Sequence, residues 1–111
     1  MNTSKQQILN LGTEIYRLTA KLPAEEERTL TEMFIRATGD IAANIAMSDA
    51  DLTDEPAQFL STACGKIAVI ETLLLLCVKL NYLAAVEIAT ASNLCAELDA
   101  QMRKSLSEKI L

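Results

Sequence analysis

The stretch "LSTACGKIAVIETLLLLCVKL", residues 60–80, decides the fold, because its apolar side chains recur at helical spacing. They follow one another by threes and fours, which places them along a single face of an α-helix. The residues of this first stripe are Leu60, Ala63, Ile67, Ile70, Leu74 and Cys77. The stretch does not alternate cleanly between apolar and polar residues, as a half-buried strand would. It therefore predicts a long helix packed against other helices.

A second apolar stripe runs along the same helix. Its members are Val69, Leu73, Leu76 and Leu80, and it is rotated by about 100° from the first. A helix in a four-helix bundle needs an apolar stripe only a little wider than about 100°. Surplus apolar surface on a soluble chain marks a protein contact, so we predict that this stripe forms a homo-oligomer interface. The alternative is that long side chains of neighbouring helices cover it.

The rest of the chain predicts three more helices around this one. We expect a single domain over residues 1–111, with helices at about 3–22, 25–48, 54–80 and 84–109. Pro23 and the turn "SDADLTDEP" (48–56) separate them, and Glu25, Glu26 and Glu27 should open the second at the positive end of its dipole. The expected core faces of the other three helices are Ile8, Leu11, Ile15, Leu18 and Leu22, then Leu30, Phe34, Ala37, Ile41 and Ile45, then Ile88, Ala91, Cys95, Leu98 and Met102. Short connections predict an all-α, antiparallel, up-down-up-down four-helix bundle.

The second helix also carries a face of small residues opposite its core stripe. It consists of Ile35, Gly39, Ala42 and Ala46, which could admit a neighbouring backbone. We predict that it belongs to the oligomer interface as well. The alternative is that these are simply solvated alanines.

A polar row crosses the same helix, with Arg36, Asp40 and Asn44 spaced four apart. One interpretation is a recognition patch at a subunit interface. The favoured interpretation is structural: Asn44 is a buried hydrogen-bonding group that fixes the register of the helix, and Arg36 and Asp40 form an exposed pair.

Composition argues against catalysis and for a cytoplasmic protein. The chain has no histidine, which removes the commonest general base, and no metal-binding spacing or glycine-rich phosphate loop, so we expect no enzyme activity, cofactor or metal. Its three cysteines form no CxxC pair and fit free thiols in a reducing compartment. The N-terminus has no signal pattern, and the run "LLLLCV" (73–78) is too short to span a membrane. The net charge of −5 argues against nucleic-acid binding.

Several ordered features resemble a known family. They run through Pro23, Glu27, Leu30, Arg36-Ala37, Ile41 and Asn44-Ile45-Ala46, and continue with Phe59-Leu60, Ala63, Gly65, Glu71-Thr72 and Tyr82-Leu83. This pattern, over about residues 8–105, resembles bacterial four-helix bundle proteins encoded in intervening sequences of large-subunit ribosomal RNA genes. The same family includes accessory variability proteins of diversity-generating retroelements. The chain departs from the usual pattern at Met33, Ile35, Lys66 and Met47-Ser48.

The resemblance implies a protomer that assembles into a ring of five. Retroelement members are basic and contact nucleic acid, whereas this chain is acidic. We therefore expect a non-enzymatic oligomeric scaffold or interaction module, whose partners are its own copies and possible other proteins. The alternative function is a nucleic-acid accessory protein, and its candidate contacts are Lys5, Arg17 and Lys21, which a ring could multiply into a basic band.

Overall fold

The computed structural model describes residues 3–50 and 53–110, and over this range the protein is helical with no strand. Asp51 and Leu52, inside the predicted turn between the second and third helices, lie outside the described residues. The elements are α1 (Thr3–Thr19), a short 3₁₀ turn η1 (Ala24–Glu26), α2 (Leu30–Asp49), α3 (Pro56–Lys79) and α4 (Ala85–Ile110). The predicted all-α class is confirmed.

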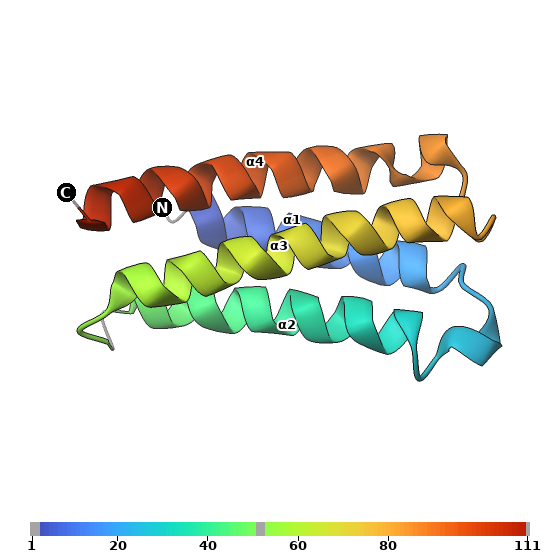
Figure 1. Ribbon diagram of the computed structural model, residues 1–111, viewed down its shortest axis with the longest axis horizontal. Coiled ribbons are helices and arrows are strands. Elements are labelled where there is room, and N and C mark those ends of the chain that lie inside the picture. The colour runs from blue at the N-terminus through green and yellow to red at the C-terminus, as the bar shows by residue number, and fades with distance from the viewer. Residues whose placement is uncertain (1–2, 51–52, 111) are drawn as a thin grey trace.

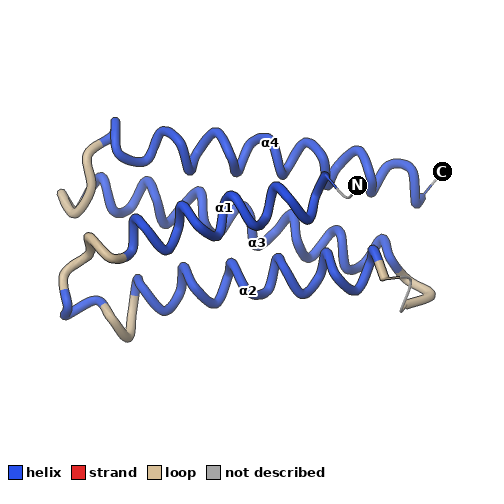
Figure 2. The backbone as a smooth tube through the Cα atoms, turned by 180° about the vertical axis from the view of Figure 1, so that it is seen from behind, coloured by secondary structure: helices blue, strands red, loops and turns tan. Residues whose placement is uncertain are grey.

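The four α-helices form an up-down-up-down bundle (Figures 1 and 2). Contacts join α1 to α2, α2 to α3, α3 to α4 and α4 back to α1, while α1 and α3 lie diagonally across the bundle. The two ends of the chain lie at the same end of the bundle, as an even number of antiparallel helices requires (Figure 1). The cross-section is therefore roughly square, with one helix at each corner.

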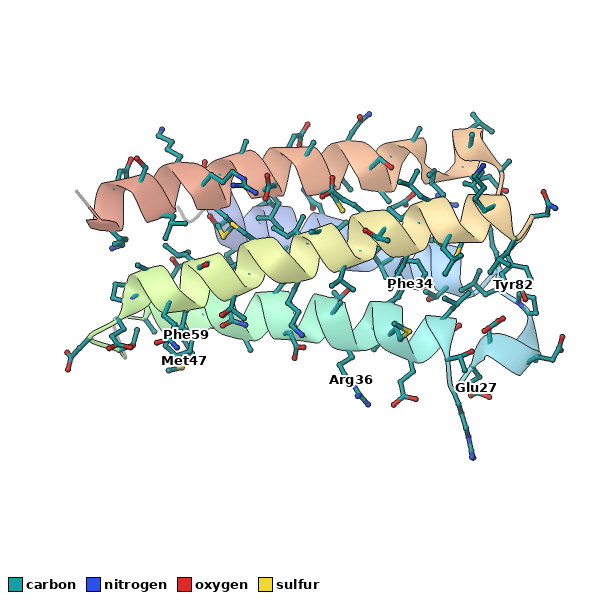
Figure 3. The ribbon with its side chains drawn as sticks, in the orientation of Figure 1. Glu27, Phe34, Arg36, Met47, Phe59 and Tyr82 are labelled. Carbon is teal, nitrogen blue, oxygen red and sulfur yellow. The ribbon has the colours of Figure 1, made fainter. Side chains whose placement is uncertain are left out.

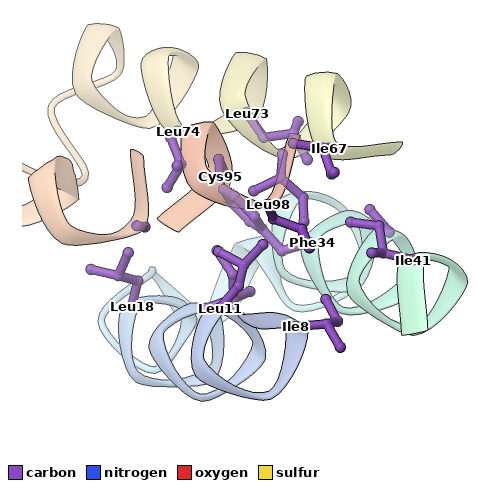
Figure 4. Packing of buried hydrophobic residues seen from close by; sticks show 14 of the residues in the cluster. Ile8, Leu11, Leu18, Phe34, Ile41, Ile67, Leu73, Leu74, Cys95 and Leu98 are labelled. Atoms are coloured by element: carbon purple, nitrogen blue, oxygen red, sulfur yellow. The ribbon is translucent and has the colours of Figure 1, made fainter. Parts of the chain in front are cut away.

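A single apolar core fills the space between the helices. Every residue of the four predicted core stripes is buried, including Leu11, Phe34, Ile67 and Leu98, whose side chains interdigitate in Figure 4. Burying such side chains supplies the main driving force for folding. The spacing of apolar residues thus predicted the core of the bundle correctly.

The prediction that Leu73 belongs to an exposed stripe is wrong. Its side chain is only 6% exposed and joins the core, whereas Val69, Leu76 and Leu80 remain 39%, 41% and 45% exposed. Leu73 follows the core stripe on the side of α3 that faces α2, so α2 covers it. The second stripe of α3 is therefore narrower than its sequence pattern predicts.

By length and composition alone, α3 could cross a membrane. Core helices of soluble proteins meet the same criterion, and α3 packs seven side chains into the bundle. Its high hydropathy is explained by one face in the core and a second apolar face outside it.

The second helix begins at Leu30, five residues later than expected. Glu25 and Glu26 lie in the η1 turn, and Glu27 lies in the irregular turn that follows, so these acids do not open α2. The chain must cross the end of the bundle here, because both Leu22 and Leu30 are buried. Glu26 stabilises the crossing by accepting hydrogen bonds from the Thr29 hydroxyl and, at 2.8 Å, from the Tyr82 hydroxyl.

A capped turn brings Tyr82 to this position. Asn81 has a φ of 62°, and the N–H groups of Asn81 and Tyr82 donate to the carbonyls of Val78 and Cys77. This is a Schellman ending of α3, with asparagine as the left-handed residue. Figure 3 shows Tyr82 at the same end of the bundle as Glu27, and Met47 and Phe59 at the other end.

We predict that Tyr82→Phe destabilises the protein at pH 7 and that the loss shrinks in acid. Hydrogen bonds from Thr29 and Tyr82 lower the pKa of Glu26 below 4.5, so its contribution is present above that pH and is lost as the pH falls through the lowered pKa. The bond to Glu26 raises the pKa of Tyr82 above 10, so the wild type also loses this contribution in strong base. Urea denaturation of both proteins across pH measures the difference. A difference that is constant from neutral pH into acid would contradict the assignment.

Candidate interaction surfaces

An open apolar groove lies between α1 and α2. It has a volume of about 590 Å³, and none of the described residues that line it carries a charge. Its floor holds Gly12 and Gly39, while Leu9 and Tyr16 on α1 are each more than half exposed. A second hollow of about 460 Å³ continues it past Ala42 and Ala46. We call this surface, with Ile35, the α1/α2 groove.

The helices approach closely at the floor of this groove. A Cβ atom placed on Gly12 would lie 3.3 Å from Cγ2 of Thr38, so this glycine allows α1 and α2 to pack closely. Three of the small residues predicted for the interface, Gly39, Ala42 and Ala46, are exposed in the described chain, and Ile35 is half-buried. The structure thus brings all four together on one surface.

A second apolar surface lies between α2 and α3. Its hollow is lined by Met33, Gly65, Ala68, Val69, Thr72 and Leu73, and Val69 and Met33 project from it. Along α3 it continues to the exposed Leu76 and Leu80. We call this surface the α2/α3 face. An adjoining hollow that contains Arg36, Asp40 and Lys66 gives it a polar border.

The sequence prediction missed part of both surfaces. Leu9 and Tyr16 are seven residues apart on α1 and lie outside the core stripe of that helix. Met33 lies outside the core stripe of α2. A search for a second apolar stripe, which identified Val69 and Leu76 on α3, would also have found the pair on α1.

The polar row on α2 does not form the predicted contacts. Arg36 pairs with Glu32 one turn earlier, at 2.6 Å, and points away from the bundle (Figure 3). Asp40 pairs instead with Lys66 on α3, at 3.3 Å. The Nδ2 atom of Asn44 donates to the carbonyl oxygen of Asp40 at 2.6 Å, within its own helix. Because this bond reaches no neighbouring helix, it cannot fix the register of α2 against one.

The three basic residues proposed for nucleic acid do not gather on one surface. Arg17 binds Glu14 with contacts of 2.8 and 2.5 Å, and Lys21 binds Glu87 on α4 at 2.9 Å. Lys5 lines the far part of the α1/α2 groove, on another side of α1. The N–H of Ala84, followed by Lys21, lowers the pKa of Glu87, and the bond to Arg17 lowers that of Glu14. The charges of Arg17 and Lys21 are thus compensated by carboxylates.

The cysteines offer no activated thiol. Burial raises the pKa of Cys64, Cys77 and Cys95, and it raises that of Cys95 to about 12, with smaller contributions from Glu71 and Asp99. A thiol with a raised pKa stays protonated at neutral pH and is a poor nucleophile. Within residues 3–50 and 53–110, no three Cys, Asp or Glu side chains lie close enough together to hold a metal ion.

A comparison with protein families adds a decisive finding. Residues 2–104 match the family described as 23S rRNA-intervening sequence protein. The chain belongs to this family. The resemblance inferred from the ordered residues is therefore confirmed, over nearly the range expected. No curated protein matches the chain.

We predict that Asn44→Ala and Asp40→Ala each change the free energy of unfolding by less than about 1 kcal/mol. The Asn44 side chain bonds only to a carbonyl that the helix already uses, and alanine is the better helix former. The Asp40–Lys66 pair is exposed, and such pairs contribute little. Chemical denaturation of the two variants is the measurement. A loss of about 2 kcal/mol or more for Asn44→Ala would restore the buried structural role.

Proposed function

We propose that this member of the 23S rRNA-intervening sequence protein family is a non-enzymatic scaffold that self-assembles, with the ring of five implied by its family resemblance. The observation that carries the proposal is the exposed apolar stripe of Val69, Leu76 and Leu80, which the bundle itself leaves uncovered. Large exposed apolar patches on soluble proteins are characteristic of protein contacts. Symmetric self-association is the commonest way to cover them in small proteins.

The composition of the two surfaces supports this proposal. The α1/α2 groove and the α2/α3 face are uncharged at their centres and are bordered by charged residues such as Lys5, Asp49, Arg36 and Lys66. Protein interfaces have the same arrangement, with a core depleted of charge inside a polar rim. Three free thiols, two of them buried, suit a reducing cytoplasm. A further protein could bind the assembled scaffold.

We predict that Leu76→Glu dissociates the assembly into subunits of 12.1 kDa. The leucine is 41% exposed in the protomer, so the variant should still fold, but a carboxylate buried in an interface would lose its hydration without a partner. Sedimentation velocity at micromolar concentration measures the change.

The matched control is Val86→Glu. Val86 is also an exposed apolar residue, but it lies on α4, which lines neither surface. This variant should keep the mass of the wild type. A wild-type protein that sediments as a monomer would refute the proposal, and equal behaviour of the two variants would exclude the α3 stripe as the interface.

The second candidate function is a nucleic-acid accessory protein, which the family description favours because it refers to 23S rRNA. Charge opposes it. The net charge is −5, and both Arg17 and Lys21 are paired with glutamates.

We therefore predict no measurable binding of generic RNA or duplex DNA at physiological salt, because too few unpaired cations are available to release counterions from phosphates. Fluorescence anisotropy with labelled RNA and DNA, at low and moderate salt, tests this. Sub-micromolar binding that weakens steeply as salt is added would favour the accessory function instead.

A further inference from the structure

The two apolar surfaces lie at the same level along the bundle. The Cβ contact between Gly12 and Thr38 places the centre of the α1/α2 groove beside residue 38 of α2. The ion pair between Asp40 and Lys66 places the neighbouring α2/α3 face beside residue 40. Two copies joined through these surfaces would therefore lie side by side with little axial shift.

The two surfaces also meet at one helix. Both include α2, and since the bundle has one helix at each corner, the surfaces are adjacent sides of a square, at about 90° to each other. The ion pairs Lys21–Glu87 and Arg103–Asp99 both involve α4, at the diagonally opposite corner. Apolar and charged surfaces thus divide the molecule into an α2 side and an α4 side.

Two glycines mark the centres of the apolar surfaces. Gly39 lies in the α1/α2 groove and Gly65 in the α2/α3 face, each within a helix. A Cβ atom on either would meet no other atom of the chain within 4 Å. Glycine is less favourable than alanine inside a helix, and the packing of the protomer gives no reason for it at these two sites. A close neighbour outside the chain would give one.

We infer that the α1/α2 groove of one copy receives the α2/α3 face of the next copy. Shape supports this pairing, because the groove has a floor of Gly12 and Gly39, while Val69 and Met33 project from the opposite partner surface. The contact is heterologous, since each copy uses two different surfaces. The inference rests on the self-assembly proposed above and specifies which surfaces form it.

This pairing closes into a ring. Contact surfaces about 90° apart, with little axial shift, turn each copy by about 90° relative to the last and close after about four copies; an angle of about 108° closes after about five. The helix shared by both surfaces then lies nearest the ring axis. The Glu32–Arg36 pair on the outside of α2 would face the central opening, and α4 would form the outer wall.

Cysteine cross-linking tests the pairing. In a Cys64→Ser background, which removes the half-buried thiol, Ala42→Cys marks the groove and Val69→Cys marks the α2/α3 face. A short bismaleimide should give covalent dimers when the two single variants are mixed and allowed to exchange subunits, and essentially none with either variant alone. Val86→Cys mixed with either variant is the control and should give none.

A chain that carries both Ala42→Cys and Val69→Cys should give a ladder of covalent oligomers that stops at the ring size. A ladder that continues without limit would mean a filament and would overturn ring closure. Efficient dimers from one single variant alone would mean a symmetric contact, and an assembled protein without mixed cross-links would mean other surfaces. Either result overturns this inference while leaving self-assembly intact, whereas a monomeric wild type overturns both.

Discussion

The structure depends on one packing constraint: α3 has more apolar surface than a four-helix bundle can bury. The first stripe of this helix, which includes Ile67 and Leu74, is fully buried against the other helices. Leu73 lies at its edge and is covered by α2, but Val69, Leu76 and Leu80 are beyond the reach of either neighbour. The exposed stripe is thus a geometric consequence of placing this sequence at one corner of a square bundle.

The same constraint divides the outer surface of the protein. On the side of α2, small residues such as Gly39 and Ala42 leave a groove, and Val69 forms the neighbouring apolar face. On the side of α4, Lys21 and Arg103 form ion pairs with glutamate and aspartate. Exposed ion pairs of this kind contribute little to stability but keep a surface hydrated. One side of the molecule therefore suits water, and the other suits a partner.

The sequence predicted the core well, because helical periodicity depends only on the spacing of apolar residues. It predicted the connections less well. The acidic run at Glu25–Glu27 resembles a helix start, but the chain must cross the bundle end there, and the Glu26–Tyr82 bond joins residues far apart in sequence. The partners of Arg36 and Asp40 were wrong for a related reason: two possible partners compete at similar spacing, and only the position of Lys66 on α3 decides between them. The contribution of α1 to the groove was missed because Leu9 and Tyr16 become neighbours of α2 only in the folded bundle.

Small-angle X-ray scattering of the unmodified protein tests the central claim most directly. The protomer has a Cα radius of gyration of 14.2 Å and a mass of 12.1 kDa. If further copies cover the apolar surfaces, the scattering will give a radius clearly larger than this and a mass that is a fixed multiple of the protomer mass across the micromolar range. A radius close to 14.2 Å with a mass of 12.1 kDa would contradict the account.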